Sequence, residues 1–250
     1  MTKGLVYIAF GEQYNNLAAH TVFYSRQFTD LPICVMTNVE NKCPKWKGIE
    51  NISFINFPME QKENRKVKTS LVSYSPFDLT LYLDCDSIIQ NEGMEKLFDY
   101  FENSDLLLNI WGKWLPGQKI YQIYTEIMGK VGVHLPITIY YGGFIGFKKN
   151  ERVEKFFSLW NQYWKIHGRT REMPALACAV KNSDVHIVEF SSKDRVFCAR
   201  ERIDSKAIIQ HEYGKKFFEL IGLPDFVPQT VDADKNSWEK VLYEQSALGL

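Results

Sequence analysis

The chain has 250 residues, and its 30 basic and 30 acidic side chains give a formal net charge of zero, so no general attraction for nucleic acid or an anionic membrane is expected. No apolar run approaches the ~20 residues that span a bilayer, and no signal peptide is visible. Five scattered cysteines without CxxC spacing argue against a disulfide framework or a zinc knuckle, and a single cytoplasmic α/β domain is the expectation.

The first part of the chain alternates strands and helices. Apolar runs predict strands at residues 4–11, 32–38 and 52–57, and Asn15 and Asn16 are the expected caps of a helix after the first strand. Strand, helix and strand at this spacing form a right-handed crossover unit and predict a parallel sheet. Another helix is expected at residues 64–75, ended by Pro76.

Residues 78–89 follow and carry the first candidate site. The run is apolar enough to predict one strand buried on both faces, with Asp84 and Asp86 near its end. At a spacing of two, both carboxylates point to one face, where a cation between them would relieve their repulsion. Oxygen ligands of this kind suit Mg²⁺ or Mn²⁺, and ligands collect at the carboxyl ends of such strands. A solvated Asp-x-Asp turn is the alternative that the pair alone leaves open.

The second part is less regular. A short helix at residues 93–102 and a strand at 106–111 precede a broken, aromatic-rich insertion at 111–136, which is typical of a binding loop. Residues 137–147 predict a strand, a glycine turn and a second short strand. The remaining expected elements are helices at 151–167 and 172–180, a strand at 185–190, an apolar run at 203–211 and a last helix after Asn236.

His211 is the third candidate metal ligand. A lone histidine is more often structural, so its context carries the argument. It ends an apolar run and is followed by Gly214, Lys215 and Lys216, where open backbone and two ammonium groups could meet an anion. An imidazole beside two carboxylates favours Mn²⁺ over Mg²⁺.

Four motifs follow one another in a characteristic order: Leu81-Tyr-Leu-Asp-Cys-Asp86, Tyr141-Gly-Gly-Phe-Ile-Gly-Phe147, Arg171-Glu-Met-Pro-Ala-Leu176 and His211-Glu-Tyr-Gly-Lys-Lys216. Together they resemble nucleotide-sugar-dependent glycosyltransferases of the GT-A fold, and most closely the glycogenin-like and bacterial lipooligosaccharide galactosyltransferase-like group. The resemblance spans most of residues 4–216. It implies a single GT-A-like α/β domain, with a Rossmann-like, mostly parallel central sheet flanked by helices and a small antiparallel part near the active site.

The resemblance also implies a division of the domain and roles for single residues. Residues 1–110 would form a nucleotide-binding half, 111–216 an acceptor and donor-sugar half, and 217–250 a tail. Asp84 and Asp86 would hold the metal that bridges the two phosphates, with Asp86 and His211 as its more direct ligands. The other implied contacts are Lys216 on the diphosphate, Ala9, Phe10, Gly11 and Tyr14 around the base, Lys66 or Lys68 near the sugar nucleotide, and Gly142 with Gly143 against the donor sugar.

Glu172 falls where the family places an acidic or amide residue facing the reacting centre, so Glu172 and Asp86 are the expected catalytic residues. An inverting enzyme would need Glu172 as base for the acceptor hydroxyl, whereas a retaining enzyme would not. Two departures from the family pattern lie near the donor sugar. Tyr141 stands where Asn is frequent, and Glu172-Met173 replaces Asp-Gln. The sugar and the stereochemical course therefore stay open.

The sequence thus predicts a metal-dependent hexosyltransferase that moves a sugar from a nucleotide diphosphate sugar, expected to be a UDP-sugar, to a hydroxyl of a glycan, lipid-linked or protein acceptor. The candidates for stacking on the acceptor are Trp111, Trp114, Tyr121 and Tyr124. A non-catalytic sugar-nucleotide-binding protein of the same fold is one alternative. An Asp-x-Asp phosphatase is another, although three strands precede the motif and no strand precedes the later acidic pair, Asp232 and Asp234.

The expected last helix presents three apolar side chains, Trp238, Val241 and Leu242. They could contact a membrane surface peripherally, a second copy of the chain in a homodimer, or the domain itself.

Overall fold

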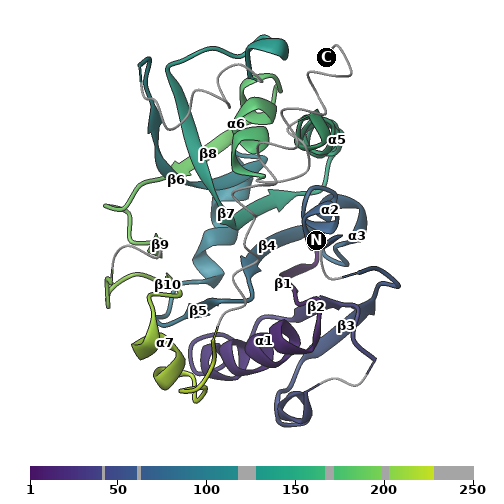
Figure 1. Cartoon of the computed structure of the whole chain (residues 1–250), viewed down its shortest axis with the longest axis vertical. Helices are drawn as coiled ribbons and strands as arrows, with labels where there is room; N and C mark the ends of the chain where they lie inside the picture. The colour runs from purple at the N-terminus through teal and green to yellow at the C-terminus, as the bar shows by residue number, and fades with distance from the viewer. Residues whose placement is uncertain (41–42, 61–62, 118–127, 167–171, 199–202, 228–250) are drawn as a thin grey trace.

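A mixed seven-stranded sheet forms the centre of the computed structural model, which describes residues 1–40, 43–60, 63–117, 128–166, 172–198 and 203–227 (Figure 1). Its strand order is β3-β2-β1-β4-β7-β6-β8. The strands are β1 (Lys3–Ile8), β2 (Ile33–Thr37), β3 (Ile52–Asn56), β4 (Leu79–Asp84), β6 (Leu106–Trp114), β7 (Ile137–Lys148) and β8 (Ile187–Phe190).

Most neighbouring strands of this sheet run parallel. The strands β3, β2, β1 and β4 are parallel to one another, and β8 is parallel to β6. Only β7 is antiparallel to its neighbours β4 and β6 in the part of the sheet that is described. The predicted Rossmann-like, mostly parallel sheet is therefore confirmed.

A small second sheet lies beside the carboxyl end of β4. It is built from β5 (Ser87–Ile89), β9 (Phe197–Cys198) and β10 (Ile209–His211), in the order β5-β10-β9. The strand β10 is antiparallel to β5, with His211 opposite Ser87. This β5–β10 pair is the small antiparallel part that the sequence predicted, whereas β9 is parallel to β10. The pairing brings the end of β10 to the end of β4.

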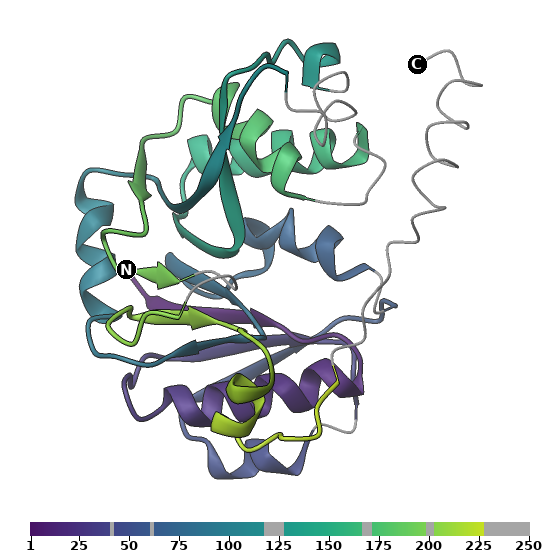
Figure 2. The ribbon, with the colours of Figure 1, turned by 60° about the vertical axis from the view of Figure 1, so that its left-hand side comes forward.

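Helices cover both faces of the large sheet (Figures 1 and 2). The side chains of β1 alternate between the two faces, and Leu5 and Val6 are both fully buried. On one face lie α1 (Glu12–Ser25), η3 (Glu95–Glu102) and α7 (Lys215–Leu220). On the other lie α2 (Asn64–Lys68), α3 (Leu71–Tyr74), α5 (Glu151–Ile166) and α6 (Met173–Lys181), while η1 (Pro44–Gly48) packs beside α1.

The stretch 78–89 does not form the single strand that its apolar run predicts. The chain leaves the large sheet at Asp84, turns through Cys85 and Asp86, and enters the small sheet as β5. The turn is fixed on both sides: Thr21 Oγ1 donates to the Cys85 carbonyl at 3.0 Å, and the Glu212 N–H donates to the Asp86 carbonyl at 2.9 Å. These partners are distant in sequence, so local pattern could not reveal the turn.

The glycines of residues 142–146 do not form a turn either, because β7 is one continuous strand. A side chain at Gly146 would place its Cβ 2.8 Å from Leu107 and 2.9 Å from Leu81, on the two neighbouring strands. Glycine is needed there for close packing of strands, which a sequence pattern cannot distinguish from a turn.

Two helix predictions also change in detail. The expected helix at 64–75 is two short helices, α2 and α3, separated at Thr69 and Ser70. Helix α1 begins at Glu12 after Gly11, so Asn15 is inside the helix and not its cap. Asn15 Oδ1 accepts instead from the Cys43 N–H at 3.0 Å and from Trp46 Nε1 at 3.1 Å, and thereby holds η1.

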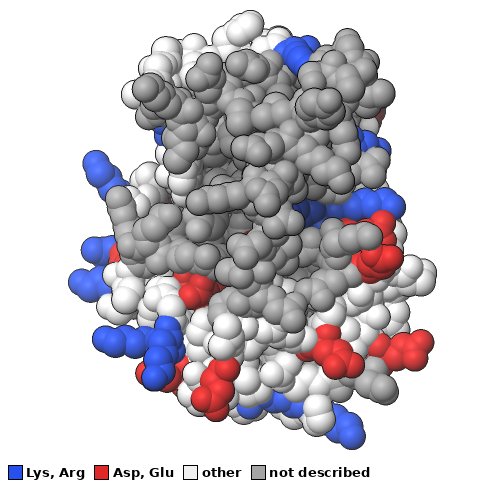
Figure 3. Space-filling model, viewed as in Figure 1, with Lys and Arg blue, Asp and Glu red and all other residues white. Residues whose placement is uncertain are grey.

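Several predictions fall on residues outside those described: Tyr121 and Tyr124 of the insertion, Arg171, and the tail residues Asp232, Asp234, Trp238, Val241 and Leu242. In the described ranges, no helix combines the length and apolar character needed to cross a membrane. Basic and acidic side chains are interspersed on the face shown in Figure 3, in keeping with the zero net charge.

Candidate metal and donor site

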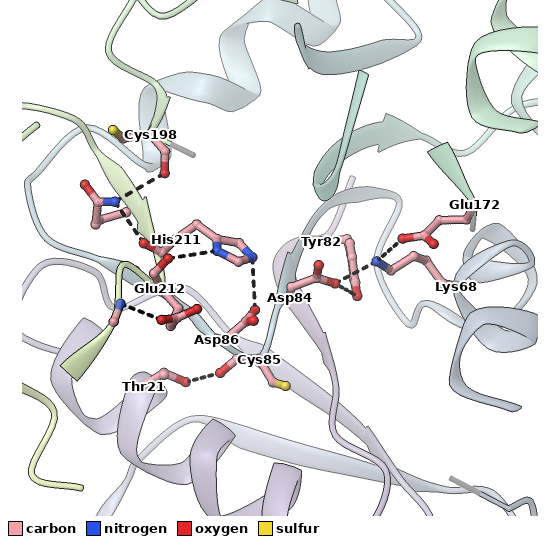
Figure 4. A network of polar contacts seen from close by, with 12 residues as sticks. Thr21, Lys68, Tyr82, Asp84, Cys85, Asp86, Glu172, Cys198, His211 and Glu212 are labelled. Carbon is pink, nitrogen blue, oxygen red and sulfur yellow. Dashed lines mark hydrogen bonds and ion pairs between the residues drawn. The ribbon is translucent and has the colours of Figure 1, made fainter. Parts of the chain in front are cut away.

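The candidate site lies where β4, β7 and β10 meet (Figure 4). Asp84 is the last residue of β4, Asp86 lies in the turn after it, and His211 is the last residue of β10. One suitable ligand atom from each of these three residues lies within 4.8 Å of the others. The three side chains that the sequence placed at a metal are thus brought together.

Asp86 and His211 contact each other directly. His211 Nε2 lies 3.3 Å from Asp86 Oδ1, while the other ring nitrogen lies 3.4 Å from the Glu212 carbonyl oxygen. The ring is packed edge-on against Tyr141 at a centroid distance of 5.6 Å and against Phe197 at 6.1 Å. These contacts direct one ring nitrogen toward Asp86, as a metal-ligating histidine requires.

Gly142 and Gly143 lie against the side chains of the cluster. A Cβ at Gly143 would lie 3.0 Å from Asp84 Oδ2 and 3.4 Å from His211 Cδ2, and one at Gly142 would lie 2.9 Å from Glu172 Oε1. A larger residue at either position would therefore crowd these carboxylates. Two carboxylates and an imidazole fit a divalent cation of the Mn²⁺ or Mg²⁺ type.

On the other side of Asp84, four alternating charges form what we call the charge ladder: Asp84, Lys68, Glu172 and Arg65. Lys68 Nζ lies 2.7 Å from Asp84 Oδ1 and 3.2 Å from Glu172 Oε1, and Arg65 Nε lies 3.2 Å from Glu172 Oε2. Tyr82, on the same face of β4, donates its hydroxyl to Asp84 Oδ1. Lys68 is only 6% exposed, so its charge depends on these partners.

The ladder fixes the protonation of its members. Burial alone would raise the pKa of Glu172, but Lys68 and Arg65 outweigh it and hold that pKa at about 2. Burial would lower the pKa of Lys68, yet Asp84 and Glu172 raise it above its ordinary value. Burial and the neighbouring Asp84 raise the pKa of Tyr82 well above its ordinary value, so its hydroxyl remains a donor. Glu172 is ionised at neutral pH and is a poor proton acceptor.

The residues expected around the base follow the end of β1. Ile8 pairs with Asp84 across β1 and β4, so Ala9, Phe10 and Gly11 follow at the same edge of the sheet. Ala9 and Phe10 are buried, Tyr14 is half-buried, and the Gly11 N–H donates to Asn38 Oδ1 at 2.6 Å.

Two expected lysines lie on exposed surface. Lys66 pairs with Glu63 at 3.4 Å, on the side of α2 away from Lys68. Of the two alternatives, Lys68 is therefore the one at the carboxylates. Lys216 lies in the first turn of α7, directly after the Gly214 turn.

Sequence reasoning missed two members of the site. Tyr82 precedes Asp84 by two strand positions, so strand alternation could have placed its hydroxyl on the same face. Arg65 precedes Lys68 by three helix positions, which puts the two basic groups on one face of α2.

The comparisons with known proteins bear on the fold. No protein-family model matches the sequence, and no curated protein matches it either. Two solved structures of the galactosyltransferase LgtC are similar, one in complex with donor and acceptor sugar analogs and one of an active-site mutant. Each has a TM-score of 0.57 and 14% sequence identity, and covers 90% of this chain and 98% of its own. At that identity the likeness establishes the GT-A-like fold.

Proposed function

We propose that this protein is a metal-dependent glycosyltransferase that moves a hexose from a nucleotide diphosphate sugar, a UDP-sugar in the first instance, to an acceptor hydroxyl. The observation that carries the proposal is the convergence of Asp84, Asp86 and His211 within 4.8 Å at the carboxyl end of β4. The fold is shared with a galactosyltransferase that has been crystallised with donor and acceptor sugar analogs, which supports the same reaction class.

Asp86 and His211 would hold the metal most directly, and Asp84 Oδ2 would complete the protein's share of the site. A bound Mn²⁺ or Mg²⁺ would neutralise negative charge that develops on the departing diphosphate. Lys216 would contact the same diphosphate, and the residues at the end of β1, Ala9, Phe10 and Gly11 with Tyr14, would enclose the base. Gly142 and Gly143 would let the donor sugar lie against backbone.

Glu172 acts in this proposal as a fixed negative charge and not as a base. Its pKa of about 2 makes it a weak proton acceptor at neutral pH. A carboxylate beside the anomeric carbon stabilises the positive charge that grows there as the sugar–phosphate bond breaks. The acceptor oxygen bonds to that carbon, the phosphate oxygen leaves, and the hydroxyl proton passes to the leaving phosphate.

The test combines binding and turnover in the full chain. UDP-glucose, UDP-galactose, UDP-N-acetylglucosamine and GDP-mannose are each added with Mn²⁺ or with EDTA, and both the melting temperature and the release of nucleoside diphosphate are measured. We expect one UDP-sugar to raise the melting temperature by about 5 °C when Mn²⁺ is present, and not when EDTA is present. We also expect Asp86→Ala to abolish the shift and the release.

The matched control is Asp99→Ala, which removes an exposed aspartate of η3 and should leave both signals intact. A Mn²⁺-dependent shift without release, in the presence of simple glycoside acceptors, would favour a non-catalytic sugar-nucleotide-binding protein. No shift with any donor would overturn the proposal.

A further inference from the structure

Two side chains act on the same oxygen of Asp84. The Tyr82 hydroxyl donates to Asp84 Oδ1, and Lys68 Nζ lies 2.7 Å from that atom (Figure 4). The two donors come from different elements, since Tyr82 belongs to β4 and Lys68 to α2. A carboxylate oxygen has two lone pairs, so these two donors fill the hydrogen-bonding capacity of Oδ1.

Both donors are held where they are. Tyr82 is 2% exposed and Lys68 is 6% exposed, and Lys68 Nζ lies 5.2 Å from the centre of the Tyr82 ring. Lys68 is also fixed from its other side by Glu172 Oε1 at 3.2 Å. A buried hydroxyl or ammonium group that loses its partner is costly, so neither donor leaves Oδ1 easily.

The other oxygen of Asp84 has different surroundings. Within the described ranges, Asp84 Oδ2 accepts no hydrogen bond. A Cβ at Gly143 would lie 3.0 Å from Oδ2 and 3.4 Å from His211 Cδ2, so Oδ2 is on the side of the imidazole. The carboxylate therefore presents one oxygen to the metal cluster, while its other oxygen is bound inside the fold.

A ligand that offers one oxygen suits some cations better than others. Ca²⁺ takes about 6–8 oxygen ligands and accepts both oxygens of one carboxylate. Mg²⁺ requires nearly octahedral geometry at shorter distances, and imidazole suits transition metals such as Mn²⁺ better than Ca²⁺. Hydrogen bonds to a ligating carboxylate fix its orientation and so affect which metal it binds. An Asp84 limited to Oδ2 therefore disfavours Ca²⁺.

From this geometry we infer that Tyr82 is a positioning residue that makes Asp84 a one-oxygen ligand and thereby selects Mn²⁺ or Mg²⁺ against Ca²⁺. Tyr82 acts through Asp84 and not on the cation itself. Without its hydroxyl, Lys68 alone holds Oδ1, and the carboxylate can turn about its Cβ–Cγ bond until both oxygens face a larger cation. The inference rests on the metal site of the proposed function, but not on sugar transfer.

The test is a pair of affinities, for Mn²⁺ and for Ca²⁺, measured on the full chain without nucleotide. Electron paramagnetic resonance of free Mn²⁺ gives the first Kd, and displacement of Mn²⁺ by Ca²⁺ gives the second. We expect Tyr82→Phe to lower the ratio of the Ca²⁺ Kd to the Mn²⁺ Kd by about threefold or more. A general loosening of the fold would weaken both cations alike, so the ratio distinguishes positioning from a structural effect.

Tyr7→Phe is the matched control. Tyr7 is fully buried on the neighbouring strand β1, and its hydroxyl has no hydrogen-bond partner among the described residues. Its ratio should equal that of wild type. An unchanged ratio in Tyr82→Phe, or an equal fall in Tyr7→Phe, would overturn the inference. So would a wild type that binds no Mn²⁺, or that binds Ca²⁺ as tightly as Mn²⁺.

Release of nucleoside diphosphate from UDP-sugars, measured on the same preparations, separates this inference from the proposed function. The expected fall in the ratio without any release would sustain the role of Tyr82 and remove the transferase. Release together with an unchanged ratio would sustain the transferase and remove the role of Tyr82.

Discussion

Asp84 and Asp86 stand two positions apart, yet the regions around them differ. Asp84 Oδ1 accepts from Tyr82 and lies 2.7 Å from Lys68 Nζ, whereas Asp86 Oδ1 faces His211 Nε2 at 3.3 Å. The two aspartate side chains are 27% and 24% exposed, so exposure does not separate them. What separates them is the partner, a permanent cation in one case and an imidazole in the other.

This difference indicates a division of labour within one short motif. The charge ladder neutralises Asp84 from inside the fold and ties β4 to α2 and to the start of α6. The Asp86 and His211 pair joins the turn after β4 to β10. Here a bound cation from solution would neutralise the carboxylate of Asp86. The Asp84 region should therefore govern stability more, and the Asp86 region should govern metal binding more.

Lys68→Met tests the Asp84 region most severely. The substitution leaves two carboxylates beside each other without their shared cation, which typically costs about 3 kcal/mol or more in the free energy of unfolding. Urea denaturation at pH 7 measures this loss. A change below about 1 kcal/mol would mean that the ladder contributes little to the fold.

Glu172→Gln tests how the contribution of the charge ladder to stability depends on pH. The folded-state pKa of Glu172 is about 2, below its ordinary value of 4.5, so the stability that its charge contributes is full above pH 4.5 and is lost as pH falls toward 2. We expect the variant to be about 2 kcal/mol less stable at pH 7 and the gap to narrow below pH 4.5. Urea midpoints at pH 7, 4.5 and 3 show the effect, and a gap that stays constant would contradict it.

Tyr82→Phe removes one hydroxyl from Asp84 and keeps the buried ring. A hydrogen bond to a charged group is worth about 1.5 kcal/mol, and we expect a loss of that size. Tyr100→Phe, at an exposed tyrosine of η3, is the matched control and should change stability by less than about 0.5 kcal/mol. Equal effects of the two changes would contradict the contact with Asp84.

Lys66→Met has the smallest expected effect on stability and serves as the matched control for Lys68→Met. Lys66 is exposed and pairs only with Glu63 among the described residues, so its loss should cost less than about 0.5 kcal/mol. Urea denaturation alongside Lys68→Met makes the comparison direct. Comparable losses at the two positions would show that helix propensity, and not the ladder, sets the cost.

Strands β1 and β4 were predictable because burial on both faces requires continuous apolar runs. What failed depended on contacts between distant residues. The break after Asp84 follows from pairing of β5 with β10, and Gly146 of β7 is required by Leu81 and Leu107 on the neighbouring strands. Neither contact can be predicted from the pattern of residues along a short stretch of sequence.

The same distinction applies to the site. Asp84, Asp86 and His211 could be predicted because strand spacing and the order of the motifs mark them. The choice between Lys66 and Lys68 could not, since it depends on which side of α2 packs inward. The role of Glu172 likewise depends on Lys68, 104 positions away, whose proximity lowers its pKa and disfavours the role of base.

The most direct test is a titration of Mn²⁺ binding in the presence of UDP, for wild type, Asp84→Asn and Asp86→Asn. Electron paramagnetic resonance measures the free Mn²⁺ at each step. Asn is nearly isosteric with Asp, so each variant removes chiefly a charge. We predict that Asp86→Asn raises the Kd for Mn²⁺ at least tenfold more than Asp84→Asn does. Equal losses, or a greater loss at Asp84, would contradict the division between the two carboxylates.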